Sequence, residues 1–151
     1  MEVRPSFDEI YMNLAVDLAK RSTCKRANVG CVIVSIDNQR VLAIGYNGNY
    51  KHGPNQCDSD EPGNCGCIHA EDNACIKLNY NDSSKRKLYT TTSPCITCAK
   101  RIINAEIEEV IYLNAYRKTE GLQLLQSRGI FVKQLEARNV QIYKDKEVRE
   151  V

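Results

Sequence analysis

Long apolar runs, a secretory leader and a strong excess of either charge are all missing from this 151-residue sequence. A membrane-spanning helix needs about 20 consecutive apolar residues, so we expect no bilayer span. Residues 1–20, MEVRPSFDEIYMNLAVDLAK, carry acidic side chains where a secretory signal has an uninterrupted apolar core, and they predict an amphipathic helix instead. The net charge is only +2, which gives no broad basic surface for a long nucleic acid. We therefore expect a cytoplasmic protein that binds neither membrane nor long nucleic acid.

The remaining composition is that of an ordinary globular chain, with 42% hydrophobic and 26% charged residues. A chain of this length supports one sizeable core and buries roughly 70% of its unfolded surface. No repeat, low-complexity tract or linker divides the sequence. We predict a single domain over residues 1–151.

Helical and strand patterns alternate along the chain. Ile10, Leu14 and Leu18 have helical spacing and predict a first helix of about 14 residues that ends near Arg21. VGCVIVSI (29–36) and VLAIGY (41–46) predict two antiparallel strands joined by DNQR. The later elements are expected to be a helix at 69–79, a strand at 87–93, a helix beginning at Pro94, a strand at 109–113, a helix at 119–129 and a strand at 130–135. This order predicts a layered α/β domain.

Eight cysteines are the clearest chemical signal in the sequence. A reducing cytosol leaves metal binding or catalysis as the usual reason for clustered thiols. Cys95 and Cys98, in PCITC, are three residues apart and are expected on one face of a first helical turn, where unpaired N–H groups favour thiolates. His69, at another helix start, supplies a third ligand. Three protein ligands leave a fourth tetrahedral position for water, as catalytic zinc requires.

Glu71 follows His69 by two residues and completes the H-x-E with P-C-x-x-C signature of zinc nucleobase deaminases. A bare C-x-x-C would be weak, because redox pairs and zinc ribbons also contain it. The alternative is purely structural: His69 caps a helix, and Cys95 and Cys98 are buried small side chains. A carboxylate beside a three-ligand site has no such structural reason, so Glu71 favours catalysis.

Four further cysteines are placed to bind a second ion. Residues 47–66 are too rich in Gly, Pro, Asn and Asp for regular structure, and a loop this long usually needs a function or an external tie. One zinc could join three segments here and form a closed structural site, with Cys24, Cys57, Cys65 and Cys67 as ligands. His52 is the competing ligand. Cys31 and Cys75 lie in apolar surroundings and are expected in the core.

The segments RSTCKRANVGCVIV, GYNG, HAEDNA and SPCITC together resemble the deoxycytidylate (dCMP) deaminase family, within the zinc-dependent cytidine deaminase superfamily. The resemblance runs from the first helix to about Gly129. It implies a three-layer cytidine-deaminase-like α/β fold, with a mixed sheet of about five strands flanked by helices. It also implies zinc-dependent hydrolysis of dCMP to dUMP and ammonia.

The resemblance further assigns roles to residues of this chain. Glu71 would be the proton shuttle, and the backbone N–H of Ala70 would hold the pyrimidine O2. Asn47 would bind the deoxyribose hydroxyl. The residues that match the phosphate side of the family are Arg26, Lys25 and Tyr116. Some family members carry a second zinc in the regions of Cys24, Cys57, Cys65 and Cys67.

Other readings and partners remain open at this point. The resemblance implies a homo-oligomer, with a hexamer as the common form, activation by dCTP with Mg²⁺ and inhibition by dTTP. A related deaminase could instead act on free cytidine, deoxycytidine or tRNA adenosine, although the modest charge argues against tRNA. The remote alternative is a non-catalytic zinc-binding interaction module.

Overall fold

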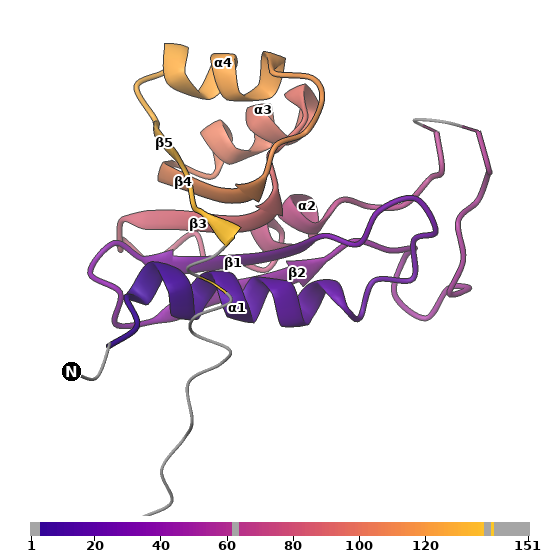
Figure 1. Cartoon of the computed structure of the whole chain (residues 1–151), viewed down its shortest axis with the longest axis horizontal. Coiled ribbons are helices and arrows are strands. Elements are labelled where there is room, and N and C mark those ends of the chain that lie inside the picture. Colours follow the sequence, from indigo (N-terminus) through magenta and orange to yellow (C-terminus); the bar gives the residue numbers. More distant parts are fainter. Residues whose placement is uncertain (1–3, 62–63, 138–139, 141–151) are drawn as a thin grey trace, which may run out of the picture.

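The structure is a computed structural model that describes residues 4–61, 64–137 and 140. Four helices and five strands alternate along these residues (Figure 1). Their order is α1 (Phe7–Ala19), β1 (Gly30–Ser35), β2 (Val41–Tyr46), α2 (Ala70–Cys75), β3 (Arg86–Thr92), α3 (Ile96–Asn104), β4 (Ile107–Asn114), α4 (Glu120–Ser127) and β5 (Phe131–Gln134).

The five strands form one mixed sheet in the order β2-β1-β3-β4-β5. β1 pairs antiparallel with both β2 and β3, while β3, β4 and β5 run parallel to one another. The predicted hairpin is confirmed: Asn38 takes a φ of 67° in its turn, where an asparagine tolerates the left-handed region. The parallel strands are linked through α3 and α4, as a parallel connection requires a crossover.

Helices cover both faces of this sheet, which gives three layers. Every residue of β1 is buried, and its side chains alternate between two cores. Cys31 and Ile33 point into the core that contains α2 and α3, whereas Val32 and Val34 point into the core on the α1 side. The predicted three-layer α/β fold with five strands is therefore confirmed.

α2 packs closely against β2 at Gly45. A Cβ on Gly45 of β2 would lie 2.4 Å from the carbonyl oxygen of Ala70 and 2.7 Å from the nitrogen of Ala74. Only glycine allows this approach of helix to strand. α2 is shorter than the predicted 69–79, because after Cys75 the chain tightens into turns in which Lys77 N donates to Ala74 O.

The connections at one end of the sheet extend well beyond it. In Figure 1 the segment between α1 and β1 and the long loop between β2 and α2 project together to the right of the sheet. Of the C-terminal tail, which has no predicted role, residues 138–139 and 141–151 lie outside the described part, and Val140 is buried in the α1-side core. None of the helices in the described ranges has the length and apolar character of a bilayer-spanning segment.

Candidate active site and a second cysteine cluster

His69, Cys95 and Cys98 come together where α2 and α3 begin. His69 Nδ1 lies 3.1 Å from Cys98 Sγ and 3.6 Å from Cys95 Sγ. A tetrahedral zinc with bonds of about 2.05 Å to nitrogen and 2.3 Å to sulfur separates these atoms by roughly 3.5 Å. The geometry of the three side chains therefore fits a zinc ion, and it leaves one tetrahedral position for another ligand.

Two of these side chains are carried by residues that cap helices. His69 precedes α2 and Cys95 precedes α3, both with extended backbone, while Cys98 lies in the first turn of α3. Cys95 O accepts the first helical hydrogen bond, from Ala99 N, so the two cysteines share the first turn of α3 as predicted, with Cys95 at its cap. The extended backbone of Cys95 turns its thiol toward His69, and Cys98, which is fully buried, reaches the same point from within the helix.

Hydrogen bonds and charges couple the acidities of these three side chains. Hydrogen bonds from Cys98 and His69 lower the pKa of Cys95 to about 3. The same contact with Cys95 raises the pKa of Cys98, and burial adds to that shift. The hydrogen bond to Cys95 also raises the pKa of His69. The lowered pKa favours the thiolate form of Cys95, which is the form that binds zinc.

Glu71 lies behind this cluster, on the first turn of α2. Its side chain is only 4% exposed, and Oε1 accepts a hydrogen bond of 2.8 Å from the Thr90 hydroxyl. Burial raises the pKa of Glu71, against the opposing effect of that hydrogen bond. A carboxyl group with a raised pKa can both accept and donate a proton near neutral pH, as a general acid and base must.

A cavity of about 340 Å³ opens onto both Glu71 and the three-ligand cluster. Its walls come from the α1–β1 connection, the β2–α2 loop, the ends of β3 and β4 and the starts of α2 and α3. The lining residues are Cys24, Arg26, Ala27, Val29, Asn47, Cys65, Cys67, His69, Ala70, Glu71, Thr92, Ser93, Pro94, Cys95, Tyr116 and Arg117.

Most of the expected substrate residues line this cavity. Asn47 is buried, and its side chain accepts from Val29 N at 2.8 Å and donates to Ala27 O at 2.7 Å. These two bonds leave one amide hydrogen of Asn47 for another partner. Arg26, Ala70 and Tyr116 also line the cavity.

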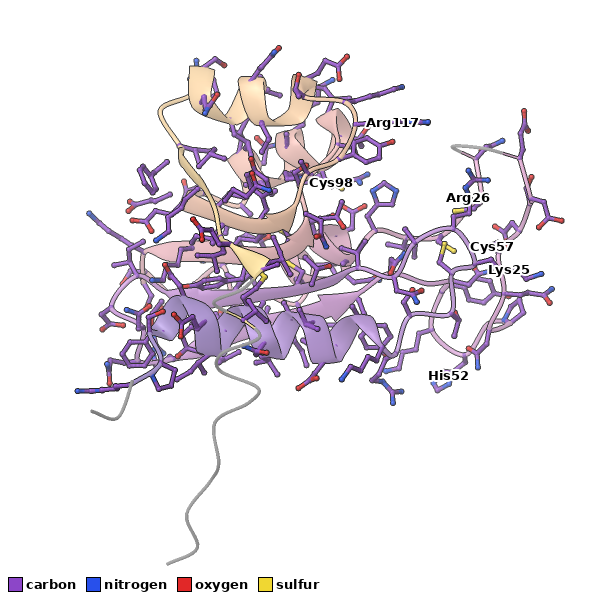
Figure 2. All side chains as sticks on the ribbon, viewed as in Figure 1. Lys25, Arg26, His52, Cys57, Cys98 and Arg117 are labelled. Carbon is purple, nitrogen blue, oxygen red and sulfur yellow. The ribbon has the colours of Figure 1, made fainter. Side chains whose placement is uncertain are left out.

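Lys25 has a different environment. Its exposed side chain is not among the cavity-lining residues, and its backbone N–H donates to Cys57 Sγ. Figure 2 shows Lys25 beside Cys57 in the projecting loops, and His52 below them. Of the two neighbouring basic residues, Arg26 is therefore the one placed to meet a bound molecule.

Sequence reasoning missed Arg117, which lines the cavity next to Tyr116. In Figure 2 Arg117 projects near the start of α4, above Cys98. The available signal was its position directly after Tyr116, a residue already matched to the phosphate side. Ser93 was missed as well: its hydroxyl accepts from the N–H of Tyr116 at 2.6 Å and so fixes the chain after β4.

The second cluster contains Cys24, Cys57, Cys65 and Cys67. Sγ of Cys24 lies 3.7 Å from that of Cys57 and 3.9 Å from that of Cys65, and Cys57 and Cys67 are 3.7 Å apart. Zinc bound to four thiolates at about 2.3 Å separates the sulfurs by roughly 3.8 Å, whereas disulfide sulfurs are about 2.05 Å apart. These distances fit a closed zinc site. His52 is not part of the cluster.

Short backbone contacts surround this cluster. Asp58 N and Ser59 N both donate to Cys65 O, and Gly48 pairs with Ile68 through two backbone hydrogen bonds. Gly66 has a φ of 85°, a conformation that L side chains rarely adopt. The tight turn at Gly66 places Cys65 and Cys67 on the same side of the loop.

The cysteines of this cluster differ in acidity. Burial acts to raise the pKa of Cys24, but hydrogen bonds from the backbone N–H groups of Ala27 and Arg26 outweigh it and lower the pKa to about 7. Burial and neighbouring thiols raise the pKa of Cys67. Metal binding requires the deprotonated form of each thiol, so an ion here would release protons.

Comparisons with known proteins agree with the site and the fold. The chain belongs to the cytidine and deoxycytidylate deaminase family, because the profile of that family's zinc-binding region matches residues 5–114. The deoxycytidylate deaminase of Saccharomyces cerevisiae is 38% identical over 144 residues, which are 87% of this chain and 46% of the yeast protein. That of Schizosaccharomyces pombe is 36% identical, over 87% of this chain and 44% of its own length.

The chain thus spans less than half the length of these two curated relatives. A solved structure matches more evenly. The dCMP deaminase of the cyanophage S-TIM5, in complex with dCMP and dUMP, is 34% identical with a TM-score of 0.76, and the match covers 89% of this chain and all of the phage chain.

Proposed function

We propose that this chain catalyses the hydrolytic deamination of dCMP to dUMP and ammonia, with zinc held by His69, Cys95 and Cys98. The observation that carries the proposal is the buried Glu71 beside a three-ligand cluster at the floor of an open cavity. Relatives named deoxycytidylate deaminase and a phage enzyme solved with dCMP and dUMP support the substrate.

Glu71 would move the protons of the reaction. When bound, zinc supplies Lewis acidity that lowers the pKa of a coordinated water to about 7. The carboxylate of Glu71 would take one proton from the attacking water and deliver it to N3 of cytosine. It would then take the second proton, from the hydroxyl group added at C4, and pass it to the departing amino group. One water is consumed and one ammonia leaves, so the carboxylate ends in its starting state.

The base and the sugar would be held by groups at the cavity floor. Ala70 is the first residue of α2, and its N–H has no acceptor within the helix. This N–H is therefore free to donate to the pyrimidine O2. The remaining amide hydrogen of Asn47 would donate to the deoxyribose hydroxyl, because its other polar atoms are already held by Ala27 and Val29.

The phosphate would lie toward Arg26, Tyr116 and Arg117. Both arginines line the cavity, Arg26 from the α1–β1 connection and Arg117 from the segment after β4, and the Arg26 guanidinium also donates to Asp60 O at 3.4 Å. A phosphate monoester carries up to two negative charges, and charge-assisted hydrogen bonds to arginine are among the stronger contacts in proteins. Two arginines at the mouth favour a nucleotide over a free nucleoside.

Turnover assays distinguish these substrates directly. The zinc-loaded protein is incubated with dCMP, deoxycytidine or a tRNA anticodon stem-loop, and ammonia release is followed. We expect a kcat/KM for dCMP at least about 100-fold above that for deoxycytidine, the scale of two lost charge-assisted contacts. Equal rates with deoxycytidine, or a preference for the RNA, would favour another member of the deaminase superfamily.

The four-cysteine cluster would hold a second, structural zinc. Its support is the match between the Sγ separations and a tetrahedral four-thiolate site. Such an ion would tie the α1–β1 connection to both ends of the long loop. Three of its ligands, Cys24, Cys65 and Cys67, also line the substrate cavity, so the ion would stabilise the wall that carries Arg26.

Regulation and assembly stay predictions of the family resemblance. Activation by dCTP with Mg²⁺ and inhibition by dTTP predict that dCMP saturation curves shift when these nucleotides are added. A hexamer predicts a molecular mass about six times that of the 17.1 kDa chain in light scattering. Unchanged curves and a monomeric mass would remove both predictions and leave the catalytic proposal intact.

A further inference from the structure

Thr90 is a buried polar residue in the centre of the sheet, directly behind Glu71. It lies on β3, between Cys31 of β1 and Tyr112 of β4, and is fully buried. Its hydroxyl oxygen is 2.8 Å from Glu71 Oε1 and also 2.8 Å from the carbonyl oxygen of Thr92. No other side-chain hydroxyl in the described residues is hydrogen-bonded to Glu71.

The alternation of side chains along β3 places Thr90 at a position that faces an apolar core. Alternate residues of a strand share a face, and Leu88, two residues before Thr90, packs into the core that contains α2 and α3. Cys31, opposite Thr90, belongs to the same core. A buried hydroxyl in such surroundings is costly unless it is hydrogen-bonded, and a valine would fill nearly the same volume.

We propose that Thr90 is a positioning residue for the proposed deamination reaction: its hydroxyl fixes the carboxylate plane of Glu71 so that this group faces the cavity and the three-ligand cluster. Thr90 anchors Oε1 from the sheet, and the carboxyl group also contacts the Cys98 side chain from α3. Glutamate has three rotatable side-chain bonds, and α2 alone would not select one orientation.

The Thr90 hydroxyl has a second hydrogen-bond acceptor, Thr92 O, besides Glu71. A threonine hydroxyl has one hydrogen and two lone pairs, so Thr90 donates to Glu71 or to Thr92 O at any moment. When the hydrogen points at Glu71, the bond is charge-assisted, and when it points at Thr92 O a lone pair remains toward Glu71. In either orientation the hydroxyl therefore keeps one contact with Glu71 and one with Thr92 O.

Four variants test the proposal in the zinc-loaded full chain. Thr90→Val keeps the shape and removes the hydroxyl, Thr90→Ser keeps the hydroxyl, and Thr90→Ala removes both. Thr91→Val is the matched control, because the buried Thr91 hydroxyl accepts only from Gly30 N, at 3.1 Å, away from Glu71. Thr91→Val should lower Tm while leaving kcat within about twofold, since it perturbs only the sheet.

We expect Thr90→Val to lower kcat for dCMP by about 10- to 100-fold, the cost of a misplaced catalytic group, with KM changed less than about threefold. Thr90→Ser should recover most of that loss. If Thr90→Val fails to fold, the kcat ratio of the serine to the alanine variant isolates the hydroxyl in the same way. A kcat within about threefold of the parent in Thr90→Val, or equal values for serine and alanine, would overturn the proposal.

A structural readout separates this inference from the proposed function on which it rests. Crystal structures of the parent and Thr90→Val, both zinc-loaded, should show the Glu71 carboxylate rotated or split between orientations only in the variant. An unmoved carboxylate contradicts the positioning role, whatever the activity. If the parent protein does not deaminate dCMP, the proposed function fails, and a rotated carboxylate still supports the positioning of Glu71 by Thr90.

Discussion

The two cysteine clusters of this chain use similar ligands but are built in different ways. His69, Cys95 and Cys98 are presented by the starts of two helices that pack on the sheet, and Cys98 is fully buried. Cys24, Cys57, Cys65 and Cys67 come from loops that project beyond the sheet (Figure 1). One cluster is positioned by the fold, whereas the other would itself position the loops.

Under the proposed function, the helix-borne cluster would serve catalysis and the loop-borne cluster would serve structure. The helix-borne cluster offers three ligands and has a buried carboxylate beside it, so a fourth position is left for chemistry. The loop-borne cluster offers four sulfurs and has no such carboxylate among its ligands, so it is closed. Cys67 precedes His69 by only two residues, so a short chain segment joins the loop-borne cluster to the helix-borne cluster.

The largest expected effect concerns Glu71, the feature that only the helix-borne cluster has. Glu71→Gln keeps the shape but cannot shuttle protons, so kcat should fall by about 100- to 10,000-fold. Zinc content, measured by atomic emission, should stay at the parent level because Glu71 is not among the proposed ligands. Near-normal turnover would remove the proton shuttle and with it the functional distinction between the clusters.

A serine substitution in the loop-borne cluster should lower stability more than activity. One in the helix-borne cluster should lower activity more than stability. Cys57→Ser should reduce zinc from two to one per chain, lower Tm by about 10 °C and keep part of the activity, since a structural zinc contributes several kcal/mol. Cys95→Ser should also lose one zinc, abolish turnover and lower Tm less, because packed helices hold its surroundings. Calorimetry, metal analysis and dCMP turnover on the same samples decide this. A parent protein with one zinc per chain would contradict it.

Arg26 and Lys25 test the part of the cavity wall that adjoins the loop-borne cluster. Both follow Cys24, but of the two only Arg26 lines the cavity. Arg26→Ala should raise KM for dCMP by about 10- to 100-fold through the loss of a charge-assisted contact, with kcat little changed. Lys25→Ala is the control and should stay within about twofold. Equal KM values for the two variants would show that the loop-borne wall does not hold the phosphate.

The smallest effect is expected at the surface ion pair between Arg101 of α3 and Asp72 of α2, which links the two helices of the open cluster. The Arg101 side chain is 52% exposed, and exposed pairs contribute about 0–1 kcal/mol. Arg101→Met should therefore change the free energy of unfolding by less than about 1 kcal/mol and kcat by less than about twofold. A tenfold loss of kcat would show that this pair, rather than core packing, sets the ligand geometry.

The sequence predicted the strands well because their β-branched runs and turn residues are local signals. VLAIGY was predicted as the strand that the structure shows, and the structure brings together both groups of side chains that were predicted to bind zinc. The sequence did not predict which residues cap the helices or which distant residues line the cavity. The extended backbone of Cys95 depends on how α3 meets β3, and Arg117 differs from any surface arginine only once the cavity is known. Nothing in the sequence singles out Thr90, because threonine is common in strands and its contact with Glu71 depends on the fold.

X-ray absorption at the zinc edge tests the two-cluster account most directly, because it counts the ligand atoms around the metal. The zinc-loaded parent should show an average of about three sulfur and one nitrogen or oxygen ligand per zinc, the mean of a four-sulfur site and a site with two sulfurs. Cys57→Ser, which should keep only the open site, should show about two sulfurs and two lighter ligands. A parent spectrum with four sulfurs alone, or a variant spectrum unchanged from the parent, would contradict the account.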